Sequence, residues 1–139
     1  MPLIRHRVAP SPIHGLGVFA AEPVEEGALI WVFDPRIDRE IPRAALADLP
    51  EPVARRVHFH AEYYPAEDLF ILSSDGDGYM NHSDTPDVRS EGRFCWAQQA
   101  IAAGEELTCD YSEIVVIDHD TGAPIIPGQE APPHSIAAG

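Results

Sequence analysis

The sequence predicts a mainly β fold of several short strands in small sheets, with one short helical insert. Apolar runs are short, as in residues 28–33, which read Ala-Leu-Ile-Trp-Val-Phe and are rich in strand formers. Glycine and proline interrupt these runs repeatedly, for instance at Pro23 and Gly27. A chain of 139 residues is long enough to bury one core of its own.

The expected strands are separated by turns along the chain. Gly15 and Gly17 mark a turn after the opening strand, and Ala103-Gly104 marks another. Residues 74–78, Ser-Asp-Gly-Asp-Gly, are typical of a loop or hairpin turn. The strands that we expect cover residues 4–8, 18–20, 28–33, 67–73, 93–97 and 106–109, with a further candidate at 115–118.

Residues 38–64 differ in character and are expected to form the insert. Pro42 suits the first turn of a helix that continues to Leu49, and Pro50 and Pro52 end it. Residues 53–59 are a candidate second short helix. From Gly122 onward the chain is rich in proline and glycine, so we expect a domain over residues 1–121 and a partly disordered tail over 122–139.

Charge and hydropathy narrow the function classes. The formal net charge of −14 repels nucleic acid and attracts basic proteins or peptides, although solubility alone would also explain it. No run approaches the roughly 18 apolar residues of a membrane span. The N-terminal residues lack the apolar region of a secretory signal, so we expect a cytoplasmic protein with no nucleic-acid or membrane partner.

Three short motifs carry the chemistry. Residues 14–19 read His-Gly-Leu-Gly-Val-Phe, residues 80–87 read Met-Asn-His-Ser-Asp-Thr-Pro-Asp, and residues 106–111 read Glu-Leu-Thr-Cys-Asp-Tyr. Each is weak alone, and a single Gly-x-Gly is most often a structural turn. Together, and in this order, they resemble the SET-domain protein lysine methyltransferases over roughly residues 3–112. The resemblance implies a SET-like β-clip fold with a knot-like crossing of its closing segments.

The resemblance also implies the cofactor, the reaction and the residues involved. It implies S-adenosylmethionine as cofactor and methyl transfer to the ε-amine of a lysine in a basic protein. Tyr111 matches the family's catalytic tyrosine, and Phe33 and Tyr63 are candidates for the substrate channel, with Tyr64 a further one. The residues implied to bind the cofactor are Gly15, Leu16, Gly17, Tyr79, Met80, Asn81, His82 and Tyr111.

The match departs from the family's pattern at several positions. Gly78 stands where an arginine is frequent, and Asp87 replaces a common asparagine. No cysteine follows Cys109, so the cysteine-rich zinc segment of many eukaryotic members is missing. Residues 114–117, residues 125–126 or a second subunit, in a homodimer, would then have to cover the cofactor.

Two other functions stay open on the sequence. A SET-like scaffold that only binds a basic partner would need neither cofactor nor catalysis, and the intact Asn81 and Tyr111 argue against it. Methylation of a small molecule or of a non-lysine group is the other alternative. Cofactor titration separates the binding module from both enzymes.

The number and spacing of the cysteines bear on whether the protein binds a structural metal. Cys95 and Cys109 form no Cys-x-x-Cys pair, and both are expected to be reduced core residues. His58, His60 and Glu62 would share one face of a strand but would lack a further ligand. We therefore expect no structural zinc. One equivalent of tightly bound zinc in purified, tag-free protein, measured by elemental analysis, would contradict this.

Overall fold

The computed structural model describes residues 1–74, 76–115 and 117–124, without the side chains of residues 76 and 77. Most of the expected tail, including residues 125–126, therefore lies outside the described residues. The described part is mostly β, and the predicted fold class is confirmed. Within it, no helix is long and apolar enough to cross a membrane.

The elements follow one another in small units. The strands are β1 (His6–Pro10), β2 (Leu16–Ala20), β3 (Leu29–Val32), β4 (Arg39–Pro42), β5 (Glu62–Tyr64), β6 (Leu69–Leu72), β7 (Asn81–His82), β8 (Val88–Glu91), β9 (Phe94–Ala97) and β10 (Glu106–Cys109). The helical elements are the 3-10 helices η1 (Arg43–Asp48) and η2 (Gly76–Tyr79) and the α-helix α1 (Glu51–His60).

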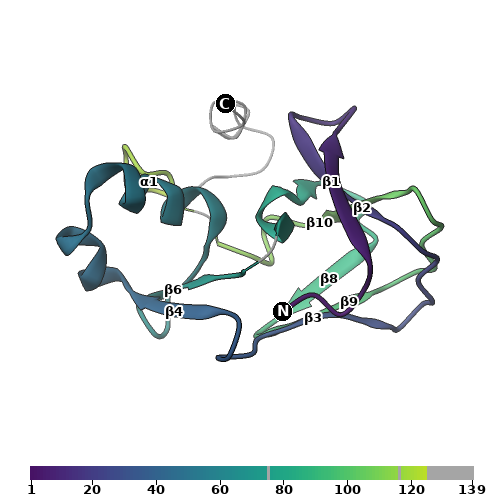
Figure 1. The fold of residues 1–139 in the computed structure, drawn as a ribbon, viewed down its shortest axis with the longest axis horizontal. Coiled ribbons are helices and arrows are strands. Elements are labelled where there is room, and N and C mark those ends of the chain that lie inside the picture. The colour runs from purple at the N-terminus through teal and green to yellow at the C-terminus, as the bar shows by residue number, and fades with distance from the viewer. Residues whose placement is uncertain (75, 116, 125–139) are drawn as a thin grey trace.

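The described residues form three sheets. Their strand orders are β1-β2-β10-β7, β3-β9-β8 and β4-β6-β5. The sheet β4-β6-β5, with η1 and α1, forms one end of the molecule, and the other two sheets form the rest (Figure 1). In the first sheet, β10 pairs antiparallel with β2 and parallel with β7. This sheet therefore unites the three sequence motifs.

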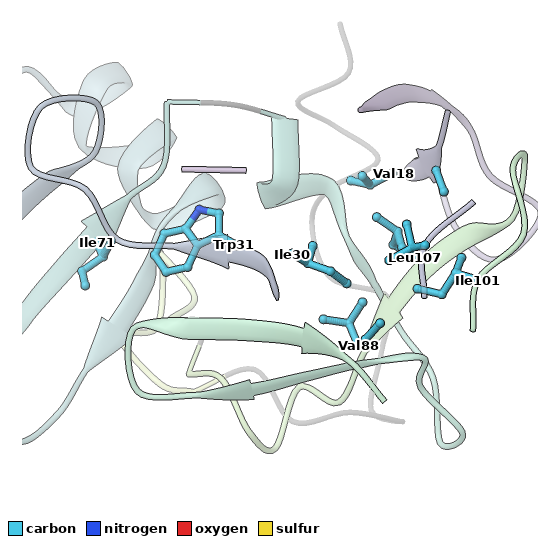
Figure 2. Packing of buried hydrophobic residues seen from close by; sticks show 10 residues of the cluster. Val18, Ile30, Trp31, Ile71, Val88, Ile101 and Leu107 are labelled. Atoms are coloured by element: carbon cyan, nitrogen blue, oxygen red, sulfur yellow. The ribbon is translucent and has the colours of Figure 1, made fainter. Parts of the chain in front are cut away.

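The main core lies between the first two sheets. Val18 on β2 stands opposite Leu107 on β10, and each is 1% exposed. Ile30, Val88 and Ile101 pack around this pair, as Figure 2 shows. The apolar residues of four strands and one loop are thereby removed from water, which is the main stabilising term for such a fold.

A second, smaller core holds the insert. Phe70 on β6 is fully buried against Leu46 of η1 and Val57 of α1. The neighbouring Ile71 belongs to the main core instead, beside Trp31 (Figure 2). Successive side chains of a strand point to opposite faces, so β6 joins the two cores.

The helices of the insert begin where prolines allow it. Pro42 precedes η1 and Pro50 precedes α1. Pro52, which we expected to end a helix, instead lies in the first turn of α1. A proline is tolerated there because the first helical N–H groups have no partner within the helix. The second predicted helix is therefore real but longer at both ends than residues 53–59.

Several predicted boundaries differ from the structure. Gly17 lies inside β2 rather than in a turn, and β1 begins at His6 rather than at residue 4. Residues 76–79 form η2 in place of a plain loop or hairpin turn. Four strands, β4, β5, β7 and β8, were not predicted from the sequence, because each is short and β4 is mostly exposed. Within the candidate strand at 115–118, the carbonyl of Val115 accepts a hydrogen bond from the Tyr63 amide, and Ile117 forms an isolated antiparallel bridge with Pro124.

Asp87 links the second motif to the third. Its Oδ1 accepts a hydrogen bond from the Thr108 amide at 2.7 Å, and the residue is 6% exposed. Burial raises the pKa of this carboxyl above its usual value, despite the opposing effect of the bonds from Thr108. An asparagine at this position would keep the acceptor oxygen without the cost of a buried charge.

Replacing Asp87 by asparagine should therefore stabilise the fold at neutral pH. Because the folded-state pKa is raised above the unfolded value, the ionised carboxylate destabilises the folded state above that pKa, and protonation relieves the cost. We expect the melting temperature of Asp87→Asn to exceed that of the wild type by about 2–4 °C at pH 7. The gap should shrink as the pH falls through the raised pKa. Asp48→Asn, at an exposed position, should show no such gap, and a destabilised Asp87→Asn protein would contradict the assignment.

Candidate functional site

The amide of Asn81 joins the glycine turn to the second motif. Asn81 is 3% exposed, and its Nδ2 lies 3.1 Å from the backbone carbonyl oxygens of both His14 and Leu16. Gly15, between them, has a φ of +46°, a conformation that favours glycine. The turn is thus shaped by a left-handed glycine and held by two carbonyl contacts to one buried side chain.

Glu106 from the third motif joins the same cluster. Its Oε2 lies 3.1 Å from Asn81 Nδ2, and its Oε1 accepts a hydrogen bond from the Ser11 hydroxyl at 2.5 Å. The carboxylate approaches Gly17 so closely that an added Cβ would lie 2.8 Å from its carboxyl carbon. Gly17 therefore permits the close approach of the Glu106 side chain to a strand and does not shape a turn.

His82 connects the second motif to the end of the third. The backbone amide of Tyr111 donates a hydrogen bond to His82 Nδ1 at 3.1 Å, so this nitrogen carries no proton. The proton is then on Nε2, which lies 3.0 Å from Asp84 Oδ1. The rings of His82 and Tyr111 also contact each other, with centroids 5.4 Å apart. These contacts fix the backbone of Tyr111 beside β7.

The Tyr111 side chain points into the protein. It is 7% exposed, and its hydroxyl donates a hydrogen bond to the Met80 carbonyl at 2.8 Å. Burial, with a smaller contribution from Cys109, raises the pKa of this phenol above its ordinary value near 10. The hydroxyl is therefore neutral at physiological pH and serves as a hydrogen-bonding group rather than as a base.

A mostly apolar cavity lies beside this hydroxyl. Tyr111, Met80 and Cys109 form part of its wall, together with the core residues Val18 and Leu107. The end of α1, β5 and β6 contribute further residues to the wall. The other described lining residues are Pro2, Ile4, His6, Ile30, Trp31, Phe59, His60, Ala61, Glu62, Ile71, Ser73, Gly78, Ser90, Cys95 and Ile114.

The assignment of Phe33 and Tyr63 to the substrate channel stays a prediction, and the structure places both residues in other contacts. Phe33 packs under the Arg93 guanidinium, whose central carbon is 5.6 Å from the ring centroid. The Tyr63 ring packs against Phe70, and its hydroxyl donates a hydrogen bond to Asp68. Neither is among the described lining residues of the cavity.

The cavity is lined by residues that were not predicted as site residues from the sequence. Glu62 lines it and Tyr63 does not, because neighbouring side chains on β5 point to opposite faces. His58 and His60 lie on α1 rather than on a strand with Glu62. His60 lines the cavity, whereas the His58 ring contacts Phe70 in the second core. Within the described residues, no group of three or more possible metal ligands occurs.

Gly78 explains one departure from the family's pattern. A Cβ at this position would lie 2.9 Å from the carbonyl oxygen of His60. The backbone at the end of α1 therefore occupies the space that a side chain would need. Beside it, the Tyr79 ring makes edge contacts with the rings of Phe59 and His60.

The three motifs that form this site match a known protein family. The SET domain family model matches residues 15–112, which include all three motifs. The chain belongs to the SET domain family. Its short second and third motifs meet as β7 and β10, as the family resemblance predicted. The threading of one segment beneath the other stays a prediction.

A much longer protein is similar to this chain in sequence. The histone-lysine N-methyltransferase of Mycosarcoma maydis, specific for H3 lysine 4, is 29% identical over 135 residues, which cover 88% of this chain. The chain spans only 9% of the length of that relative. The match thus concerns one domain of a much larger protein.

Solved structures share the fold. A candidate histone methyltransferase of Plasmodium falciparum is 19% identical with a TM-score of 0.57, covering 78% of this chain and 93% of that one. A humanized mutant of the Chaetomium thermophilum Polycomb Repressive Complex 2 is 20% identical with a TM-score of 0.55, covering 93% of this chain and 19% of that one. At these identities the likeness supports the SET fold alone.

A methyl group at position 17 should disturb the Asn81 cluster. Gly17→Ala would push the Glu106 carboxylate away from Asn81 and Ser11, which loosens the turn over residues 14–17. We expect at least about a tenfold loss of S-adenosylmethionine affinity by calorimetry, since a charge-assisted contact is displaced. The circular dichroism spectrum should be retained. Unchanged affinity in a folded variant would remove this turn from the cofactor site.

Proposed function

We propose that this chain is an S-adenosylmethionine-dependent protein-lysine N-methyltransferase that acts on a basic protein. The observation that carries the proposal is the Tyr111 hydroxyl, held against the Met80 carbonyl at the wall of an apolar cavity. The SET family match and the named activity of the Mycosarcoma maydis relative support lysine as the acceptor.

The residues around the glycine turn fit the cofactor. The amino-acid end of S-adenosylmethionine carries an ammonium, which needs hydrogen-bond acceptors. Acceptors gather here in the carbonyls of His14 and Leu16 and the carboxylate of Glu106. A Cβ built on Gly15 meets nothing within 4 Å, so this backbone is open to approach.

We assign the cofactor to the first two motifs, at β2 and β7, and to Tyr111 of the third motif. When bound, S-adenosylmethionine supplies an electrophilic methyl group on its sulfonium. The turn would hold the amino-acid end, and the backbone around His82 would receive the adenine. The residues assigned to the cofactor are Gly15, Leu16, Gly17, Tyr79, Met80, Asn81, His82 and Tyr111.

Tyr111 would orient the amine. A phenol that donates its proton to the Met80 carbonyl still has lone pairs that can accept an amine N–H. Because burial keeps the hydroxyl neutral, it directs the amine without adding a competing negative charge. The apolar wall favours the uncharged amine, which is the nucleophile. Most of the rate enhancement would then come from positioning.

The charge of the chain supports a basic protein substrate. The net charge of −14 attracts and steers cationic partners. The chain contains nine arginines and no lysine. Any methyl-lysine formed in a reaction mixture must therefore come from another protein, which makes the assay unambiguous.

Removing the Tyr111 hydroxyl should abolish most of the transfer. In Tyr111→Phe the ring still packs, so the fold and the S-adenosylmethionine affinity should change by no more than a few-fold. The rate of methyl-lysine formation in a lysine-rich protein extract should fall roughly 100-fold or more, because the lost contact positions the reacting amine. Mass spectrometry with a deuterated methyl donor measures this rate.

Tyr63→Phe is the matched control. It also removes one tyrosine hydroxyl, but from a group that bonds Asp68 away from the described cavity wall. We expect wild-type rates from it, and a loss would return Tyr63 to the channel. Equal rates in wild type and Tyr111→Phe would make Tyr111 a packing residue. If the wild type binds no cofactor and methylates nothing, a non-catalytic binding module becomes the better account.

A further inference from the structure

The cavity contains one acidic side chain that the proposed mechanism does not use. Among its described lining residues, Glu62 is the only Asp or Glu, and none is Arg or Lys. Its neighbours in the wall include apolar groups such as Ile71 and Ile114. A carboxylate in such surroundings has lost part of its hydration and is stabilised by a cation placed beside it.

One tyrosine and a strand pairing hold Glu62 in this place. Glu62 stands opposite Ile71 in the β5–β6 pair, so its position in the sheet is fixed. Tyr64, two residues along the same strand face, places its hydroxyl 3.0 Å from Glu62 Oε2 and 3.0 Å from the Gly92 carbonyl. The Glu62 carboxylate is thereby held by Tyr64 in the wall of the same cavity that Tyr111 lines.

The charge of Glu62 contributes to raising the pKa of two neighbouring groups, Cys109 and Tyr64. Burial first, and Glu62 second, raise the pKa of the Cys109 thiol, which lies in the cavity wall two residues before Tyr111. The same two causes raise the pKa of the Tyr64 hydroxyl. The negative charge therefore lies close to the part of the wall formed by β10.

This combination suits one kind of ligand. Apolar walls accommodate an aliphatic stem, and a single carboxylate accommodates a terminal ammonium; a lysine side chain carries both. The protein itself has no lysine that could enter the cavity. An arginine would bring a planar group with five donors, for which the described wall offers one carboxylate.

We propose that Glu62 is a specificity-determining residue that receives the ε-ammonium of the substrate lysine in this cavity. The inference rests on the proposed function and adds to it the group that selects the cation. Glu62 acts when the side chain binds as an ammonium, whereas Tyr111 acts after that group has lost its proton to water, when the resulting amine takes the methyl group. Removal of the Glu62 charge should therefore raise KM more than it lowers kcat.

The direct test is binding of n-butylammonium, a stand-in for the lysine side chain. Titration of isotope-labelled protein, followed by nuclear magnetic resonance, gives its affinity without any need for methyl transfer. Glu62→Gln keeps the shape and removes the charge, and should weaken binding at least about tenfold, since a charge-assisted hydrogen bond is lost. Uncharged n-butanol should bind wild type and variant alike.

Two further variants keep the test decisive. Glu91→Gln removes the same charge from an exposed position on β8 and should leave the n-butylammonium affinity unchanged. Glu62→Asp keeps the charge on a shorter side chain and should bind more tightly than Glu62→Gln, even if the latter is less stable. Equal affinity of wild type, Glu62→Gln and Glu62→Asp, or no binding to the wild type, would overturn the proposal.

The result is separable from that of the proposed function. If n-butylammonium binding depends on Glu62 but no protein lysine is methylated, the ammonium site stands and the methyltransferase assignment fails. If methyl-lysine forms with the same KM in wild type and Glu62→Gln, the methyltransferase assignment stands and the role of Glu62 is wrong.

Discussion

The fold of the site depends on the contacts of one buried amide, that of Asn81. Its Nδ2 meets acceptors from the glycine turn and from Glu106, segments 25 or more residues away in the sequence. A buried amide without such partners would cost free energy, so the three motifs must come together for any of them to be stable. The parallel pairing of β7 with β10 follows the same requirement and sets Tyr111 beside His82.

Burial then determines the chemistry available to the site. The insert closes one side of the cavity with the end of α1 and with β5, and the two main sheets close the other. Within it, Tyr111 stays neutral and Glu62 is the acidic group among the described wall residues. In one apolar space, a carboxylate can attract the substrate ammonium, and a neutral hydroxyl can orient the amine that remains after the proton is lost.

The motifs were predictable from sequence because they are local, whereas the cavity wall was not. Asn81, His82, Glu106 and Tyr111 lie in short segments whose residue types carry the family resemblance, and the family match includes them. The channel prediction chose Tyr63 over Glu62, although the alternation of a strand puts Glu62 and Tyr64 on the face opposite Tyr63. β5 has only three residues, too few for its alternation to be read from the sequence. The need for Gly17 was predicted, but its cause, the approach of Glu106 from a distant strand, requires the tertiary structure.

The central claim is that the glycine turn, β7 and the Tyr111 segment form one cofactor site. The most direct test is a titration of isotope-labelled protein with S-adenosylmethionine, in which the backbone amide shifts are followed by nuclear magnetic resonance. We expect saturable shifts that are largest at residues 14–17, 80–82 and 111 and that share one dissociation constant, while the amides of β4 stay in place. The absence of saturable shifts, or shifts confined to the insert, would contradict the account.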